Sequence, residues 1–195
     1  MRLGLRAKLL LLLLTPVVDR ISGIIASLLD LVRPRKPEIQ DVRVAPLVTA
    51  VRELLQPTAR RAGLVVSAEL ASELAVRADP NQLQQVVINL LVNAIEATPV
   101  GGRVAVRARA ARRGDGHPGV ELEVADSGTG IRREDVPRVF DPFFTTKPPG
   151  QGTGLGLAIC RDIIREHGGS VELQSEVGAG TAVRVWLPAA ASAAA

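Results

Sequence analysis

Apolar residues recur at steps of three and four along three stretches of the chain, which predicts helices over 45–62, 80–97 and 154–167. Asp79-Pro-Asn-Gln82 predicts the start of the middle helix, with Asp79 as N-cap, Pro80 at the first helical position and Gln82 closing a capping box. The apolar face of this helix is suited to packing on a sheet.

Strict alternation of apolar and polar residues marks other stretches of the chain. It predicts strands over 103–110, 120–125, 170–175 and 181–187, with further apolar strand candidates near 64–70 and 74–77. We therefore expect an α/β (α+β) two-layer sandwich, in which a mixed β-sheet faces three helices on one side.

The amino-terminal segment has a different pattern. Residues 1–16 join a basic flank to a hydrophobic run that is shorter than the roughly twenty apolar residues of a membrane span. We interpret this run as a shortened transmembrane helix, a signal-like segment or a buried helix end. An apolar stripe over 17–32 predicts a further helix, which the prolines of Arg33-Pro-Arg-Lys-Pro37 end. So narrow a stripe indicates either a homodimer through 17–32 or a helix that folds back on its own domain.

One row of polar side chains lies on a second face of the helix predicted over 80–97, beside its apolar face. Asn89, Asn93 and Glu96 are separated by four and three residues, so they lie on one face. An Asn carbonyl oxygen is a neutral hard ligand suited to Mg²⁺, which takes few protein oxygens beside phosphates and waters. The alternative is a solvated polar stripe.

Glycines follow the strand over 120–125 directly. Gly128 and Gly130 permit a tight turn and the close approach of a flat ring, and the carboxylate of Asp126 can accept a hydrogen bond from an exocyclic amine. An ordinary loop is the alternative for Asp126-Ser-Gly-Thr-Gly130.

A second glycine loop, Gly152-Thr153-Gly154-Leu155-Gly156, runs into the last predicted helix. The free N–H groups and positive end of a helix dipole attract phosphate. The loop is not a Walker loop, since no Gly-Lys-Ser/Thr follows, and it lacks the context of a Rossmann fingerprint. Residues 131–152 between the two loops predict a lid.

The three phenylalanines of the chain, Phe140, Phe143 and Phe144, all lie in this lid. Their grouping predicts a latch that packs on the domain when nucleotide is bound, with Lys147 beside it to meet phosphate oxygens. A small satellite hydrophobic cluster is the alternative.

The segments Asn89–Asn93, Asp126–Gly130, Phe140–Lys147 and Gly152–Gly156 resemble, in order and spacing, the N, G1, F and G2 boxes of sensor histidine kinases. The resemblance covers residues 40–188. It implies the Bergerat-type fold shared with gyrase, Hsp90 and MutL, ATP as substrate and Mg²⁺ as cofactor.

The same resemblance assigns roles to single residues. It implies that Asn93 holds the metal, that Asp126 reads the adenine amino group, that Thr181 backs Asp126, and that Asn89, Asn93 and Lys147 serve catalysis. The implied nucleotide-binding residues are Asn93, Glu96, Asp126, Gly128, Gly130, Phe140, Phe143, Phe144, Lys147, Gly152, Thr153, Gly154, Leu155, Gly156 and Thr181.

Residues 17–37 resemble the second helix of the dimerisation hairpin of nitrogen-regulation-type kinases, but the motif around a phosphoacceptor histidine is missing. His117 lies in a hairpin-like turn and His167 at a helix end, where a C-cap is the expected role. We therefore expect transfer of the ATP γ-phosphate to a histidine in trans, on a phosphoacceptor domain or full-length kinase, with a response regulator downstream.

Other functions remain open at this point. A non-catalytic nucleotide-binding partner of a full-length kinase is the main alternative. An ATP hydrolase is less favoured, because the amide of Asn89 stands where those enzymes carry a glutamate base. An anti-sigma serine kinase is a minor option, disfavoured by Phe140–Lys147 and the helix over 17–32.

Composition narrows the setting. The single cysteine, Cys160, suits a reducing compartment and a core position. Net charge is +4, but few aromatic residues accompany the basic ones, so nucleic-acid binding is not expected. We expect a cytoplasmic protein, alternatively at the inner face of the membrane, and a disordered tail over 189–195.

Overall fold

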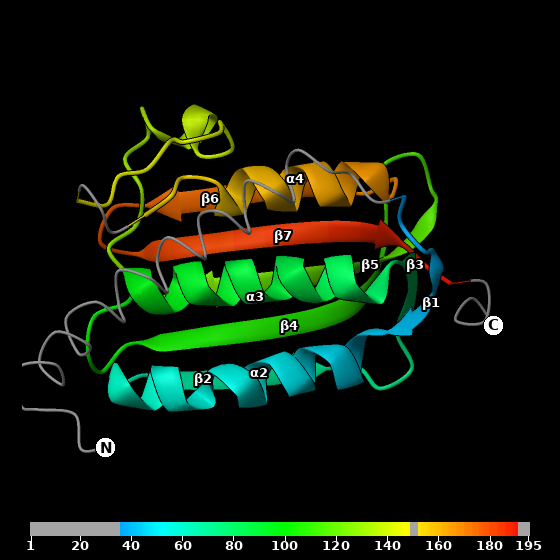
Figure 1. The fold of residues 1–195 in the computed structure, drawn as a ribbon, viewed down its shortest axis with the longest axis horizontal. Coiled ribbons are helices and arrows are strands. Elements are labelled where there is room, and N and C mark those ends of the chain that lie inside the picture. Colours follow the sequence, from blue (N-terminus) through cyan, green and yellow to red (C-terminus); the bar gives the residue numbers. More distant parts are fainter. Residues whose placement is uncertain (1–35, 149–151, 191–195) are drawn as a thin grey trace, which may run out of the picture. The chain divides into compact units, whose positions relative to one another are not determined.

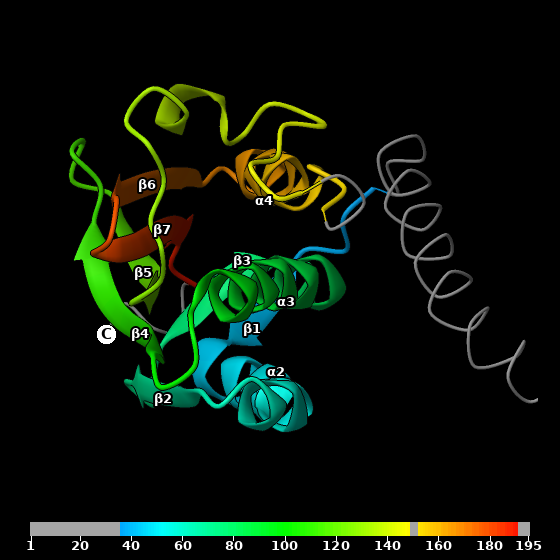
Figure 2. The ribbon, with the colours of Figure 1, turned by 90° about the vertical axis from the view of Figure 1, so that its left-hand side faces the viewer.

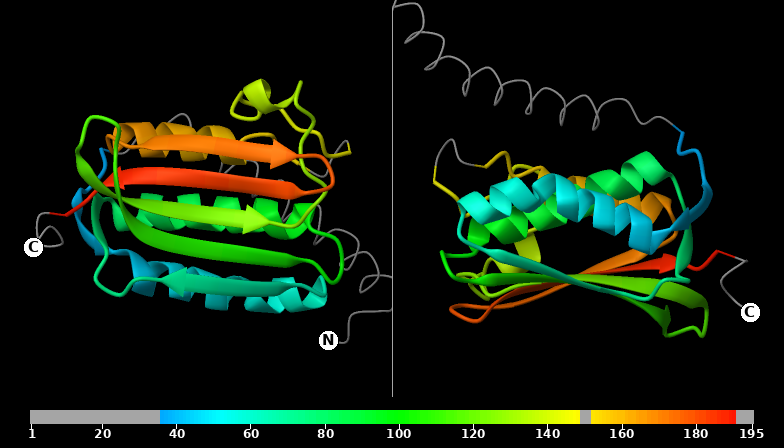
Figure 3. Two further views of the ribbon diagram at one scale, coloured as in Figure 1. Left: turned by 180° about the vertical axis from the view of Figure 1, so that it is seen from behind. Right: turned by 90° about the horizontal axis from the view of Figure 1, so that it is seen from below.

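The computed structural model describes residues 36–148 and 152–190 (Figure 1). The helices are α2 Val44–Arg61, α3 Pro80–Ala97 and α4 Gly156–Glu166, with a 3-10 turn η1 Val136–Arg138. The strands are β1 Gln40–Arg43, β2 Val65–Leu70, β3 Ala75–Ala78, β4 Arg103–Arg112, β5 Pro118–Asp126, β6 Ser170–Glu176 and β7 Gly180–Pro188. The three α-helices lie on one face of the main sheet (Figures 2 and 3), which confirms the expected α/β sandwich.

The main sheet has the strand order β2-β4-β5-β7-β6. Strands β2 and β4 are parallel and the other neighbours are antiparallel, so the sheet is mixed. Strands β1 and β3 form a separate antiparallel pair. The register of β5 and β7 sets Asp126 opposite Thr181, which brings two predicted site residues together from 55 positions apart.

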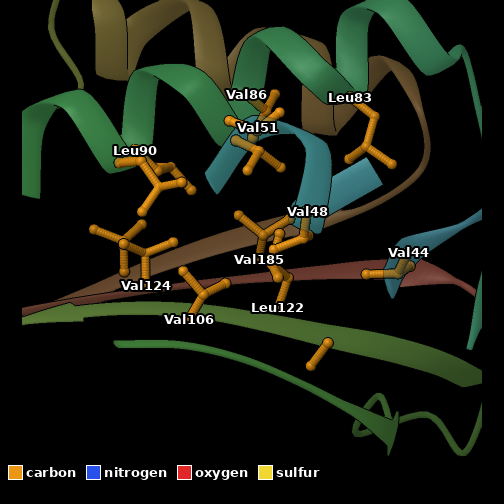
Figure 4. Packing of buried hydrophobic residues seen from close by; sticks show 14 of the residues in the cluster. Val44, Val48, Val51, Leu83, Val86, Leu90, Val106, Leu122, Val124 and Val185 are labelled. Carbon is orange, nitrogen blue, oxygen red and sulfur yellow. The ribbon is translucent and has the colours of Figure 1, made fainter. Parts of the chain in front are cut away.

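An aliphatic core fills the space between helices and sheet (Figure 4). Side chains from α2 and α3 meet the inward-facing residues of β4, β5 and β7, with burial of each Val or Leu worth about 1.5–3 kcal/mol. Cys160 of α4 is fully buried within this cluster, as predicted. Trp186 lies on the opposite face of β7, because its neighbours Val185 and Leu187 point into the core.

Trp186 is nevertheless buried. Its indole covers Gly119 of β5, where a Cβ would come within 2.3 Å of the ring. The guanidinium of Arg113 lies 4.8 Å from the ring centroid on the β4–β5 hairpin. The outer face of the sheet thus has its own small packed cluster.

The start of α3 follows the sequence pattern in part. The Asp79 carboxylate accepts hydrogen bonds from the N–H groups of Asn81 and Gln82 at 2.8 and 3.1 Å, so Asp79 is the N-cap. The expected capping box through Gln82 is wrong. The N–H of Asp79 donates instead to Nε2 of His167 at 2.9 Å, and Gln82 Oε1 is buried without a hydrogen-bond partner.

The structure differs from the predicted elements in three further places. Helix α4 begins at Gly156 rather than 154, because Gly154 has a φ of +67° that an α-helix cannot accommodate. Strand β1 was not predicted. The disordered tail was expected from 189, but Ala189 pairs with Val76 and the buried Ala190 donates its N–H to Ala75 at 2.9 Å.

The predicted segments over 1–16 and 17–35 lie outside the described residues, as do 191–195. Between 36 and 148 and between 152 and 190, no helix combines the length and apolar character that a bilayer crossing requires.

Candidate functional site

The polar row of α3 faces the start of α4. Nδ2 of Asn89 donates to the carbonyl oxygen of Gly156 at 3.4 Å, and a Cβ on Gly156 would lie 3.6 Å from Nδ2 of Asn93. Asn89 and Asn93 are half-buried, whereas Glu96 is exposed. The first two therefore belong to a contact between helices and not to a solvated stripe.

Lys147 of the lid reaches the same row. Its ammonium pairs with the carboxylate of Glu96 and lies 3.4 Å from Oδ1 of Asn93. The oxygens of Asn93 and Glu96 thus already meet a positive charge in this structure. An amide oxygen beside a carboxylate is a hard donor set that suits Mg²⁺ together with phosphate oxygens and water.

Asp126 ends β5 and starts the first glycine loop. Its Oδ1 accepts hydrogen bonds from the N–H groups of Gly128 at 2.8 Å and Thr181 at 3.2 Å. Burial raises the pKa of Asp126 above its ordinary value, and these two hydrogen bonds offset part of that effect. Both hydrogen bonds hold Oδ1 in place. Neither of them uses Oδ2.

The glycines of this loop have a role that sequence reasoning missed. A Cβ on Gly128 would lie 2.4 Å from the carbonyl oxygen of Ala97, and one on Gly130 would lie 2.0 Å from that of Glu176. Gly130 also has a φ of +69°. The loop can therefore pack between the end of α3 and the β6–β7 turn, and its approach to a ring remains a prediction.

The second glycine loop touches the lid. The N–H of Phe143 donates to the carbonyl oxygen of Gly154 at 2.9 Å, and the side chain of Leu155 is buried. Thr153 Oγ1 accepts from the N–H of Leu155 at 3.3 Å. Among the described residues no side chain caps α4, so the N–H groups of its first turn lack a side-chain acceptor there. The binding of an anion at this helix start remains a prediction.

The three phenylalanines of the lid differ in their surroundings. Phe143 is 64% exposed with a φ of 67°, and the ring of Phe144 lies 4.6 Å from the guanidinium of Arg138. Phe140 is half-buried. Gly152, the first described residue after 148, lies beside Thr145 and Lys147. A latch that closes on nucleotide remains a prediction.

Two contributors to the site have no motif in the sequence. Ser175 of β6 bonds both Thr181 and the start of the lid. His167 does occupy the C-cap of α4, but it is also buried and joins α4 to Asp79 at the start of α3. The contact of His167 with Asp79 spans 88 residues and that of Ser175 with Ile131 spans 44 residues. The only signal for them in the sequence is a polar residue on the inward face of a strand or at a helix end.

Residues 78–191 match the family model described as "Histidine kinase-, DNA gyrase B-, and HSP90-like ATPase". The chain belongs to this family. Within it, the described domain is the ATP-binding catalytic domain of a sensor histidine kinase. The resemblance to sensor histidine kinases and the fold that it implied are thereby confirmed.

The relatives in sequence and in structure are histidine kinases too. Sensor histidine kinase ZraS of Escherichia coli (strain K12) is 34% identical over 171 residues, 87% of this chain and 35% of ZraS. The chain thus spans about a third of that relative's length. The nucleotide-free catalytic domain of histidine kinase ThkA is 35% identical with a TM-score of 0.68, over 77% of this chain and 95% of that one.

A second ThkA structure contains response regulator protein TrrA. That ThkA chain is 28% identical with a TM-score of 0.76, over 97% of this chain and 53% of that one.

Proposed function

We propose that the chain is a protein histidine kinase module that transfers the ATP γ-phosphate to a histidine supplied in trans. The observation that supports this most is the meeting of three segments at one place: Asn93 of α3, Lys147 of the lid and the uncapped start of α4. These are two positive groups and one metal-type oxygen, which is what a triphosphate requires.

Each group has a distinct task in this proposal. Asp126 accepts from the adenine amine, while Lys147 and the α4 N–H groups hold phosphate oxygens. Asn93, with Glu96 beside it, would hold Mg²⁺, which when bound offsets charge on the phosphates. The bond from the γ-phosphorus to the bridging oxygen breaks, a bond to the histidine nitrogen forms, and ADP leaves.

Asn89 supports a kinase over a hydrolase. Its Nδ2 donates to Gly156, and an amide cannot take a proton from water. We expect little steady ATP turnover by the wild-type chain and a rise in Asn89→Glu, which places a carboxylate there. Rapid wild-type hydrolysis that Asn93→Ala abolishes would favour the hydrolase function.

The partners follow from the transfer. We propose a phosphoacceptor domain or full-length kinase in trans and a response regulator downstream, for which the ThkA–TrrA complex is the supporting case. We place the reaction in the cytoplasm or at the inner face of the membrane, where ATP is available. Association through residues 17–32 remains part of this proposal.

A mixing experiment tests the proposal. The full chain is incubated with γ-labelled ATP, Mg²⁺ and an isolated phosphoacceptor hairpin from a related kinase, and acid-labile, base-stable label on the hairpin is measured. We expect label with wild type and with Gln84→Ala, an exposed position of the same helix, but not with Asn93→Ala.

Nucleotide binding without transfer to any hairpin would identify the chain as a non-catalytic regulatory partner. Absence of nucleotide binding would reject both functions.

A further inference from the structure

One row of side chains crosses three strands beside Asp126. The register of β5 with β7 sets Asp126 opposite Thr181, and that of β7 with β6 sets Thr181 opposite Ser175. Ser175 is half-buried, although it lies in an edge strand of the sheet. Its hydroxyl therefore lies two strands away from the carboxylate that reads the base in the proposed function.

The hydroxyl of Ser175 makes three contacts that fix the direction of each hydrogen bond. It accepts from the N–H of Ile131 at 2.8 Å and donates to the carbonyl oxygen of Gly180 at 3.0 Å. A hydroxyl has only one proton, and the carbonyl can only accept. Across the 2.8 Å contact between Ser175 Oγ and Thr181 Oγ1, Thr181 must therefore be the donor.

With this assignment, both hydrogen-bond donors of Thr181 are already engaged. Its hydroxyl proton is given to Ser175, and its N–H is given to Oδ1 of Asp126. To any further group, the hydroxyl of Thr181 can only accept, as can ionised Asp126. This end of the site then favours a ligand edge with an exocyclic amine and disfavours one with a carbonyl oxygen.

Ser175 also reaches the lid. Ile131, whose N–H it accepts, is the first residue after the glycine loop and the first of the segment 131–152. One hydroxyl thus joins the base-reading pair to the start of the lid.

We propose that Ser175 is a positioning residue that makes the site selective for adenine over guanine nucleotides, by holding Thr181 as a hydrogen-bond acceptor. This rests on the proposed nucleotide-binding function. Without the Ser175 hydroxyl, Thr181 regains a proton that it can donate to the carbonyl oxygen of guanine.

Calorimetric titration of the full chain with ATP and with GTP, both with Mg²⁺, tests this. In Ser175→Ala we expect ATP affinity to fall about three- to tenfold, the effect of one hydrogen bond, while GTP affinity stays or rises. Ser175→Thr keeps the hydroxyl and should restore the wild-type ratio of affinities. Ser170→Ala, an exposed serine in the same strand, is the matched control and should leave the ratio unchanged.

Equal losses for ATP and GTP in Ser175→Ala would show a structural role only and overturn the inference. Wild-type chain that binds no nucleotide would overturn the proposed function instead. Thr181→Val provides a second route if Ser175→Ala does not fold. Thr181→Val should lower the ratio of ATP affinity to GTP affinity. Adding Ser175→Ala to this variant should lower the ratio no further, because both substitutions act through the same contact. An unchanged ratio in Thr181→Val would also reject the inference.

Discussion

In the proposed function, Asp126 is the residue whose ionisation matters most for the binding of ATP. Burial is the main reason that its pKa lies above the ordinary 3.8, so it takes up a proton at a higher pH than an exposed aspartate does. The protonated form accepts hydrogen bonds poorly. The same shift acts on folding with the opposite sign: it favours the folded state at low pH, and that contribution is lost as pH rises through the folded pKa.

We therefore predict that ATP affinity falls as the pH is lowered toward the pKa of Asp126. Asp126→Asn should bind ATP about tenfold more weakly near neutral pH, because a charge-assisted hydrogen bond is worth about 1.5–3 kcal/mol. Calorimetric titrations of both proteins across pH separate this effect from titration of ATP itself, which is common to both. Equal affinity and an equal pH profile in the two proteins would remove Asp126 from base recognition.

The motif residues illustrate what sequence can predict at this scale. Roles for Asp126 and Asn93 could be predicted because their chemistry and spacing form a known pattern, and these roles stay predictions. The packing roles of Gly128 and Gly130 could not, because they depend on carbonyl groups of Ala97 and Glu176 that only the fold brings near.

At the scale of elements, the buried pair of Asp79 and His167 connects α3 and α4, the two helices to which the proposed function assigns phosphate and metal. Asp79 caps α3, accepts from the N–H of Glu38 at 2.9 Å and donates its own N–H to His167 at the end of α4. Nδ1 of His167 lies 2.7 Å from the carbonyl oxygen of Ile163, so His167 donates there and accepts from Asp79. His167 is thus held as the neutral Nδ1–H tautomer.

We predict that Asp79→Ala destabilises the fold by about 2 kcal/mol, through loss of a helix cap and of a buried acceptor. Asn81→Ala, an exposed side chain in the same turn, should change stability by less than about 0.5 kcal/mol. Urea unfolding followed by circular dichroism measures both. Equal stability of Asp79→Ala and wild type would show that the pair of Asp79 and His167 contributes nothing.

The stabilisation by Asp79 also depends on pH. Burial alone would raise the pKa of Asp79, but hydrogen bonds from the N–H groups of Glu38, Gln82 and Asn81 lower it below 3.8. A group with a lowered folded pKa stabilises above its unfolded pKa, and this is lost as pH falls through the folded value. The gap between wild type and Asp79→Ala should therefore narrow below about pH 4.

Local patterns predicted α2, α3, α4 and most strands because each has a buried face with the period of its element. Strand β1 escaped, since it is four residues long and only Val42 is buried. The order of strands and the His167–Asp79 contact, 88 residues apart, depend on long-range pairing that no local period contains.

At the scale of the whole molecule, we expect neither histidine to receive a phosphoryl group. His167 is buried with both ring nitrogens engaged, and His117 lies in the β4–β5 hairpin against Asp115. We predict that the chain incubated alone with γ-labelled ATP and Mg²⁺ acquires no base-stable label. Label located on His117 or His167 by mass spectrometry under alkaline conditions would contradict this.

Trp186 lies on the face of the sheet that the helices leave open, stacked between Gly119 and Arg113. The residues that the proposed function assigns to the nucleotide lie elsewhere, on α3, on the lid, at the start of α4 and at the end of the sheet that holds Asp126 and Thr181. The chain has no tyrosine, so its ultraviolet emission comes almost entirely from this one indole. The emission will therefore shift when the β4–β5 hairpin separates from the sheet or when the sheet unfolds. It will stay nearly constant when ligand binds on the opposite side of the sheet or leaves it. The fluorescence of Trp186 therefore reports the unfolding of the protein and not the binding of ligand.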